Sequence, residues 1–191
     1  MPALKLIKSG RVCGLFIGDA PRRAKAPVDT LELTFAGVAG DAHGGLTRPA
    51  GVREPAFKRG TEIANLRQVS LVSAEELADI AQRMGITTID PRWVAANIAI
   101  EGAGPITQFA SGTVIRFLPS GASIYVTELN SPCSLAAKMI AKAGGYDTGV
   151  TSQFVRHATG RRGLVGTVYA EGRVARGDAV EVIFTQRELP S

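Results

Sequence analysis

The sequence predicts a mainly β protein with a few helices, an α+β fold arranged as a barrel or a sandwich. Short runs of β-branched and apolar residues are separated by glycines, and the chain has 22 glycines among its 191 residues. Glycines between apolar runs are typical of the tight turns and bulges of β-sheets. Several short strands with sparse helices favour a barrel or a sandwich. We expect residues 1–191 to form one domain, because this length suits a single core.

Eight runs are rich in β-branched or apolar residues and are bounded by turn-forming residues. The expected strands are residues 11–17, 28–35, 68–72, 97–100, 113–118, 123–129, 164–170 and 179–184. Between the last two runs, the segment 172–178 carries Gly177-Asp178 as a turn signal. This signal between two apolar runs predicts a hairpin near the end of the chain.

Two helices are expected in the middle of the chain. Ser73 is a suitable N-cap for the first, and Glu76 completes a capping box with it. Gly85 then ends this helix, after an apolar face at helical spacing. Asp90-Pro91 predicts a further short helix that runs through Trp93.

Cys133 lies between the strand run 123–129 and another helical pattern. Ser131 is predicted as the N-cap of this helix, with Pro132 as its first residue and Cys133 as its second. A thiol in the first turn feels the positive end of the helix dipole, which favours the thiolate, the form that attacks electrophiles and binds metals. The alternative is a small buried apolar residue, as most free cysteines are.

The segment 37–45 concentrates an acid and a histidine among four glycines. Glycines let the backbone approach a ligand closely and expose N–H groups to anions. Asp41 and His43 are two residues apart, so on a strand they would share a face. The alternative is a turn in which Asp41 accepts hydrogen bonds from its own backbone and His43 is merely exposed.

Two further segments are candidates for binding anions. Residues 156–163 contain three arginines and two glycines, which suits a phosphate cradle, although a solvated basic loop has the same composition. His157 in this segment is a candidate general base for Cys133, as in a cysteine hydrolase. Residues 44–60 have few apolar side chains and are expected to form a long loop, either functional or disordered.

The net charge and the composition limit the kinds of binding partner that we expect. The formal net charge of +5 suits an anionic ligand. The basic residues are spread out except for Arg22-Arg23 with Lys25 and for Arg161-Arg162. Neither cluster has aromatic neighbours in series, and only 6% of residues are aromatic, so we expect no nucleic-acid partner.

Two further features bear on the compartment. No apolar run approaches the roughly 20 residues of a membrane span, and the first residues do not form a signal peptide. We therefore expect no membrane partner and a cytoplasmic location. Cys13 and Cys133 are too few for a disulfide framework or a four-cysteine zinc site.

An ordered set of segments resembles the MOSC domain, the module named for the C-terminal domain of molybdenum cofactor sulfurase. The matching pieces are residues 37–43, 67–72, 96–102, Gly112-Thr113, Thr127, Pro132-Cys133, 162–164, 172–174 and 177–180. The resemblance implies a closed MOSC-type β-barrel with a few helices, as a stand-alone member of the family. It also implies a pterin-based molybdenum cofactor (molybdopterin).

The same resemblance assigns roles to particular residues. It implies that Cys133 is the metal ligand and a catalytic residue, and that Asp41 and His43 line the same site as further catalytic residues. A soft thiolate suits such a metal. Asn97, Arg161 and Arg162 are the candidates for anchoring the pterin phosphate or shaping the pocket.

Four functions remain open at this point. The resemblance implies either an oxidoreductase that reduces a small N-hydroxylated or N-oxide substrate with electrons from a redox partner protein, or a carrier that holds sulfur on Cys133 for metal–sulfur cluster or cofactor assembly. The alternative is a non-enzymatic barrel that binds an anionic ligand or a partner protein, with Cys133 only structural. A hydrolase that uses Cys133 and His157 is the least supported, because no orienting acid can be named.

Overall fold

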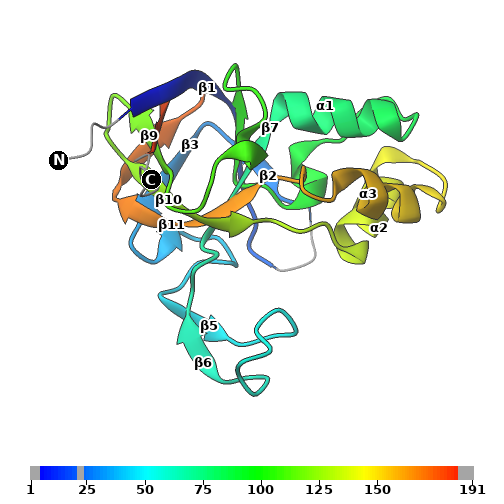
Figure 1. Ribbon diagram of the computed structural model, residues 1–191, viewed down its shortest axis with the longest axis horizontal. Coiled ribbons are helices and arrows are strands. Elements are labelled where there is room, and N and C mark those ends of the chain that lie inside the picture. The colour runs from blue at the N-terminus through cyan, green and yellow to red at the C-terminus, as the bar shows by residue number, and fades with distance from the viewer. Residues whose placement is uncertain (1–4, 21–23, 185–191) are drawn as a thin grey trace, which may run out of the picture.

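Seven strands close into a barrel in the computed structural model, which describes residues 5–20 and 24–184. In this part of the chain the ring runs β13-β9-β10-β11-β7-β8-β1 and returns to β13 (Figure 1). The strands are Lys5–Ile17 (β1), Val69–Ser73 (β7), Ile98–Glu101 (β8), Val114–Leu118 (β9), Ser123–Leu129 (β10), Leu164–Ala170 (β11) and Ala179–Phe184 (β13). The expected mainly β fold with a closed barrel is therefore confirmed.

One pair of neighbours in the ring is parallel. β7 and β8 pair in parallel, with Leu71 opposite Ile98, whereas the other ring pairs are antiparallel. A parallel pair needs a long crossover, and here the helix α1 (Ala74–Arg83) and a short 3-10 helix η1 (Pro91–Val94) lie in that connection. Both faces of such a pair are covered, and β7 and β8 accordingly bury side chains on both faces.

The core has two layers that meet at β7 and β8. Leu71 and Ile98 point into the barrel, where they join Phe117 of β9 in the interior cluster. Val72 and Ala99, the next residues along, face the other way into a second cluster beneath the helices. This alternation follows the period of two in a strand. Full burial of one large apolar side chain contributes about 1.5–3 kcal/mol, so both layers stabilise the same two strands.

The helices gather on one side of the barrel (Figure 1). Besides α1 and η1, they are α2 (Ser134–Gly144) and α3 (Val150–Ala158), with a second 3-10 helix, η2 (Ile106–Gln108). Ile80 of α1, Ile140 of α2 and Phe154 of α3 are fully buried in the second cluster. The helical layer thus rests on the outer face of β7 and β8.

Two smaller sheets complete the described chain. One contains β12 (Gly172–Ala175), β3 (Thr30–Thr34) and β4 (Gly37–Val38), and β2 (Ala26–Val28) adds to the edge of β1. The other is a hairpin of β5 (Thr47–Pro49) and β6 (Glu62–Ala64), which projects from the barrel as an arm (Figure 1). We call residues 44–66 the arm. Part of the expected long loop is therefore an ordered hairpin.

Most expected elements are present, and some bounds match to the residue. Residues 123–129, 164–170 and 179–184 are strands as predicted. Ser73 caps α1 by accepting a hydrogen bond from the Glu76 N–H at 3.2 Å. The Glu76 carboxylate, however, turns to Thr107 instead of completing the capping box. Asp90 caps η1 by accepting from Arg92 N–H at 2.8 Å.

The hairpin predicted near the end of the chain is wrong, and one helix in the last third was not predicted. The segment after β11 is not the turn of a hairpin: it forms β12, which pairs with β3, while β13 pairs with β1 and β9. Helix α3 was not predicted, and its first turn lacks a side-chain cap, with Gly149 at the N-cap position. Its apolar contacts at Val150, Phe154 and Ala158 hold it instead.

No described helix is long and apolar enough to cross a membrane.

Candidate functional site

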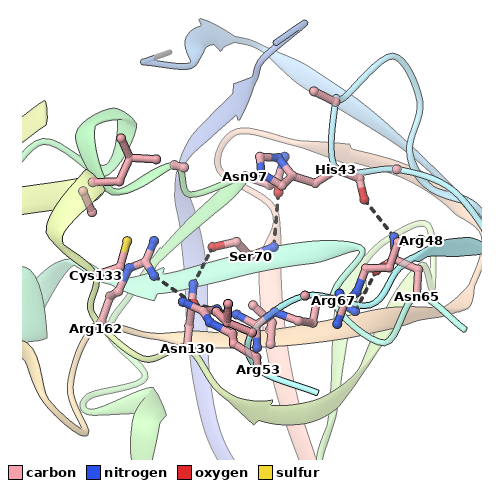
Figure 2. Close-up of a pocket in the computed structure, with 18 of the residues that line it drawn as sticks. His43, Arg48, Arg53, Asn65, Arg67, Ser70, Asn97, Asn130, Cys133 and Arg162 are labelled. Atoms are coloured by element: carbon pink, nitrogen blue, oxygen red, sulfur yellow. Dashed lines mark hydrogen bonds between the residues drawn. The ribbon is translucent and has the colours of Figure 1, made fainter. Parts of the chain in front are cut away.

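A cavity of about 600 Å³ opens between the arm, one end of the barrel and the start of α2 (Figure 2). Its lining includes four arginines, Arg48, Arg53, Arg67 and Arg162, and one carboxylate, Glu54. Cys133 and His43 also line it, as does Asn97. The cavity therefore combines a thiol with an excess of positive charge.

Cys133 is itself the N-cap of α2, which corrects the prediction that Ser131 caps this helix. Cys133 has extended backbone angles (φ −139°, ψ 157°), and its side chain makes no capping hydrogen bond. Its carbonyl accepts from Ala137 N–H at 3.2 Å, so the helix begins directly after it. The thiol lies at the positive end of the helix, as expected, but at the N-cap and not at the second helical residue. This position turns the sulfur into the cavity.

Arg162 lies beside Cys133 in the wall of the cavity. Figure 2 shows the sulfur of Cys133 next to the guanidinium group. That group donates to Asn130 Oδ1 at 2.9 Å, to the Ser131 carbonyl at 2.7 Å and to the Val94 carbonyl at 2.9 Å. Its Nε atom is buried and has no hydrogen-bond partner among the described residues. The side chain is thus firmly held, and its Nε nitrogen is left without an acceptor.

The charge of Arg162 is buried without a carboxylate partner among the described residues. Arg162 is only 7% exposed. Burial lowers its pKa to about 10; the electrostatic effect of Cys133 opposes this change, whereas the charges of Arg53 and Arg67 add to it. Because a buried cation is costly unless it is paired, an anion beside this guanidinium would be stabilised.

Arg67 and Asn130 extend this group of side chains across the cavity wall. Asn130 Oδ1 accepts from Arg67 Nη2 at 2.9 Å as well as from Arg162, and Asn130 Nδ2 donates to Ser70 Oγ at 3.4 Å. Arg67 also pairs with Glu128. We call Arg67, Asn130, Cys133 and Arg162 the Arg162 cluster. Asn130 follows β10 directly, and Gly163 follows Arg162 where β11 approaches β7.

Gly163 explains how Arg162 reaches this place. Its φ is +137°, and a Cβ at this position would lie 2.2 Å from the Leu71 carbonyl oxygen. No side chain fits there, so only glycine lets the chain enter β11 in contact with β7. Arg162, the residue before it, is thereby directed into the cavity wall.

Asp41 forms a second cluster, which Ser70 links to the Arg162 cluster through hydrogen bonds with Asn97 and Asn130. Its carboxylate accepts from Lys25 Nζ at 2.7 Å, Gly18 N–H at 3.0 Å and Asn97 Nδ2 at 2.9 Å. The His43 N–H donates to it at 3.0 Å, and His43 Nδ1 lies 3.2 Å from the same oxygen. We call Lys25, Asp41, His43 and Asn97 the Asp41 cluster. The turn alternative, in which Asp41 binds its own backbone, describes the local structure.

The electrostatics of this cluster are internally balanced. Burial by itself would raise the pKa of Asp41, but hydrogen bonds from His43 and the Lys25 ammonium hold it well below its usual range. The Asp41 side chain is fully buried and is not among the cavity-lining residues, so it lies behind the wall. Asp41 therefore orients His43 and Asn97 and does not itself face a ligand.

His43 is the member of this cluster that faces the cavity. Its side chain is 48% exposed, and contact between Nδ1 and Asp41 fixes the ring. Asn97 lines the cavity too, but its amide is engaged with Asp41, the Phe16 carbonyl and the Ser70 N–H. Asn97 therefore shapes the wall, whereas the other ring nitrogen of His43 is available for a proton.

The arm contributes a third group of charges. Arg48 pairs with Glu54, whose carboxylate also accepts from Gly51 N–H at 2.8 Å. The hydrogen bonds from Arg48 and Gly51 lower the pKa of Glu54 to about 2. The carboxylate is therefore ionised, and its oxygens already accept hydrogen bonds within the arm. Arg53 is exposed and makes no side-chain hydrogen bond or ion pair among the described residues. Arg53 is thus free to meet an anionic ligand.

Apolar side chains close the remaining side of the cavity. Trp93 of η1 and Leu135 and Met139 of α2 line it. Trp93 packs edge-on against Tyr146, with 6.4 Å between ring centroids and 77° between planes. A ligand with a flat ring and a charged group would find an apolar surface and cations in one cavity.

Several residues proposed from the sequence lie elsewhere. Arg161 is exposed and pairs with Asp79 of α1 at 2.8 Å, so it does not line the cavity. His157 lies on α3 and does not line it either, which leaves Cys133 without the proposed general base. Arg22-Arg23 fall outside the described residues, and Lys25 is buried against Asp41.

Sequence reasoning missed the polar residues that complete the site. These are Arg48, Arg53 and Arg67 with Asn65, Ser70 and Asn130. The available signal was the basic composition of residues 44–60 and the polar residues directly outside the expected strands. Their convergence depends on segments that are far apart in the chain, so no spacing rule could identify it.

Cys13 provides a contrast to Cys133. Both thiols are free, but Cys13 packs against the cluster beneath the helices. Burial, with the nearby charge of Glu101, raises the pKa of Cys13 to about 11, so it stays a thiol. Within residues 5–20 and 24–184, no three His, Cys, Asp or Glu side chains gather as a metal site. A metal here would have to arrive with other ligands.

The comparisons with known proteins agree with this fold. The family model "MOSC domain" matches residues 42–181. A curated relative from Bacillus subtilis (strain 168), named "Putative metal-sulfur cluster biosynthesis proteins YuaD", is 42% identical over 176 residues, which cover 92% of this chain and 91% of that protein. The crystal structure of the YUAD protein from Bacillus subtilis matches with a TM-score of 0.90 and 40% identity, covering 97% of this chain and 100% of the other.

A more distant structure shares the fold alone. YiiM from Escherichia coli has a TM-score of 0.55 and 18% identity, and the match covers 94% of this chain and 72% of that one.

Proposed function

The chain belongs to the MOSC domain family, and on this premise we propose that its cavity binds a pterin-based molybdenum cofactor with Cys133 as a thiolate ligand of the metal. The observation that carries the proposal is that Cys133 and four arginines line one cavity. The family is associated with this cofactor, which combines a metal, a flat ring system and a phosphate. The cavity offers a complementary group for each of these parts.

The residues present fit such a ligand. Cys133 is a soft donor beside the buried guanidinium of Arg162, whose charge has only neutral acceptors in the described chain. Arg53 and Arg67 would contact the phosphate, because guanidinium groups bind phosphate in a planar fork. Trp93, Leu135 and Met139 would cover the ring.

In the oxidoreductase form of this function, the protein would reduce a small N-hydroxylated or N-oxide substrate with electrons from a redox partner protein. When bound, the cofactor would supply two-electron oxygen-atom chemistry. His43 would hold or move a proton at Nε2 while Asp41 fixes the ring through Nδ1. Turnover of such a substrate with an artificial electron donor tests this form directly.

Metal content tests the cofactor proposal. The protein would be produced in a host that makes molybdenum cofactor and assayed by plasma mass spectrometry alongside Cys133→Ala and, as a matched control, Cys13→Ala. We expect near-stoichiometric molybdenum in the wild type and in Cys13→Ala, and none in Cys133→Ala. Freshly isolated wild type without molybdenum would contradict a stably bound cofactor.

A second candidate is a sulfur carrier, and the name of the Bacillus subtilis relative favours it. In this function Cys133 would hold sulfur as a persulfide and pass it to a metal–sulfur cluster or cofactor. The accessible thiol at a helix N-terminus supports it, because a thiolate is the form that accepts sulfur. Intact-mass analysis after treatment with polysulfide would reveal one added sulfur on Cys133. Persulfide that forms equally in Cys133→Ala would contradict this function.

A further inference from the structure

We propose that Cys133 takes its sulfur from a small dianionic sulfane donor of the thiosulfate class, and that Arg162 is the positioning residue that holds the sulfur anion. This inference rests on the sulfur-carrier function proposed above and adds the chemical class of the donor. It follows from three features: the uncompensated charge of Arg162, the distribution of the other charges in the cavity, and the position of Cys133.

Arg162 is built to face an anion at Cys133. Its side chain is 7% exposed, and its three hydrogen-bond acceptors are all neutral oxygens, from Asn130, Ser131 and Val94. Its buried Nε atom has no partner among the described residues, and the sulfur of Cys133 lies next to the guanidinium (Figure 2). A thiolate or persulfide at Cys133 would supply the missing negative charge.

The remaining charges of the cavity select the donor. Arg48 is neutralised by Glu54, and Arg67 is paired with Glu128, but Arg53 has no acidic partner in the described chain. Glu54 is the one carboxylate of the lining, so no free acid in it repels an anion. A dianion that carries a sulfonate group gains from the charges of Arg53 and Arg162, whereas a neutral sulfur donor gains nothing from them.

The reaction balances without an oxidant or a reductant. The Cys133 thiolate attacks the outer sulfur of thiosulfate, and a new bond forms between Sγ and that sulfur. The sulfur–sulfur bond of thiosulfate breaks, and its electron pair leaves with sulfite. The products are the Cys133 persulfide anion and sulfite, with the total charge unchanged. The arginines that bind the donor also stabilise the departing dianion.

The test measures sulfur loading on the full chain by intact mass, with thiosulfate and with polysulfide as separate donors. We expect both donors to add one sulfur to wild type and to Cys13→Ala, and neither to load Cys133→Ala. Inorganic sulfate, a dianion that cannot transfer sulfur, should slow loading from thiosulfate. Loading from polysulfide but not from thiosulfate would overturn the inference and leave the carrier function standing. Loading from neither donor would overturn both.

Arg162 is tested with a conservative pair of variants. We expect Arg162→Gln to slow loading from thiosulfate about ten- to a hundredfold, as for the loss of a contact to a charged group. The pH profile of Cys133 alkylation should move to higher pH in this variant and return toward wild type in Arg162→Lys. Arg173→Gln makes the same change of charge at an exposed site on β12 and should leave both readouts unchanged.

The outcome remains decisive if Arg162→Gln does not fold. In that case sulfur loading is measured on Arg162→Lys, which keeps the charge. Protection of wild-type Cys133 against iodoacetamide by sulfate is measured beside it. A wild-type thiol that sulfate does not protect would overturn the anion site. Where Arg162→Gln does fold, an alkylation profile identical to that of the wild type would overturn the positioning role.

Discussion

The Asp41 cluster and the Arg162 cluster lie at the wall of one cavity, where hydrogen bonds of Ser70 join them. They treat buried charge in opposite ways. In the Asp41 cluster the carboxylate meets the Lys25 ammonium at 2.7 Å and accepts four further contacts, so the charges cancel. In the Arg162 cluster the guanidinium meets only neutral oxygens, and its buried Nε atom has no described partner.

This difference suggests a structural role for the Asp41 cluster and a ligand-binding role for the Arg162 cluster. A neutralised cluster can fix a turn and orient a side chain, but it has little left to offer a ligand. A buried cation without a counter-ion destabilises the folded protein. An incoming anion offsets this cost, so such a cation is suited to binding an anionic ligand. The two clusters together present His43 and Cys133 toward the same space.

The largest effect on stability is expected when the carboxylate is removed from the Asp41 cluster. We expect Asp41→Ala to lower the free energy of unfolding by about 3–5 kcal/mol, because the Lys25 charge stays buried without a partner. Urea unfolding of the wild type and of His43→Ala, which keeps the ion pair, provides the comparison. A loss of less than about 1 kcal/mol would mean that water, and not Asp41, solvates Lys25.

The pH dependence of stability sharpens the same point. The pKa of Asp41 is lower in the folded protein than in the unfolded chain, where it is about 3.9. Its contribution is therefore complete above the unfolded pKa and is lost as the pH falls below about 4. We expect unfolding free energies measured from pH 7 to pH 2 to fall more steeply in the wild type than in Asp41→Asn. If the unfolding free energies of the wild type and Asp41→Asn fall in parallel with pH, Asp41 is not the source of this pH dependence.

Asn130→Asp would convert the Arg162 cluster into one like the Asp41 cluster. The new carboxylate would accept from both Arg67 and Arg162, and Ser70 could donate to it. We expect stability to stay the same or to rise by about 1 kcal/mol, because hydrogen bonds to a charged acceptor are stronger. Protection of Cys133 by sulfate should fall about tenfold, as the arginine charges are cancelled. Undiminished protection would show that these charges are not used.

The smallest effect on stability is expected at Arg53. Arg53→Gln removes an exposed charge without described contacts, so the free energy of unfolding should stay within about 0.5 kcal/mol. Sulfate protection of Cys133 should nevertheless weaken several-fold, on the order of one exposed charge contact. Arg173→Gln, with the same change of charge away from the cavity, should leave protection unchanged. Equal effects in the two variants would indicate general electrostatics instead of a contact.

Much of the fold was predictable because its signals are local. The runs 123–129, 164–170 and 179–184 are strands because alternating apolar residues bounded by turns favour that structure. Ser73 and Asp90 cap their helices as expected. Helix α3 lacked such a signal, since Gly149 offers no side-chain cap and packing against α2 and α1 stabilises the helix.

The site was predictable only in part. Cys133 and His43 line the cavity as expected, and Arg162 does so beside Cys133. Arg161, its neighbour in sequence, points to Asp79 on the helical side instead. The sequence could not distinguish these two arginines, because their roles depend on where Gly163 lets β11 meet β7.

The sequence by itself determined most strands of the barrel, the caps at Ser73 and Asp90 and a thiol at the start of a helix, since each depends on residues a few positions apart. Only the tertiary structure decided that β12 pairs with β3, that the barrel closes between β1 and β13, and that Arg162 is buried without a counter-ion. Pairing partners and charge compensation depend on distances through space. Those distances are set when segments that are far apart in the chain pack together, and no local sequence pattern encodes them.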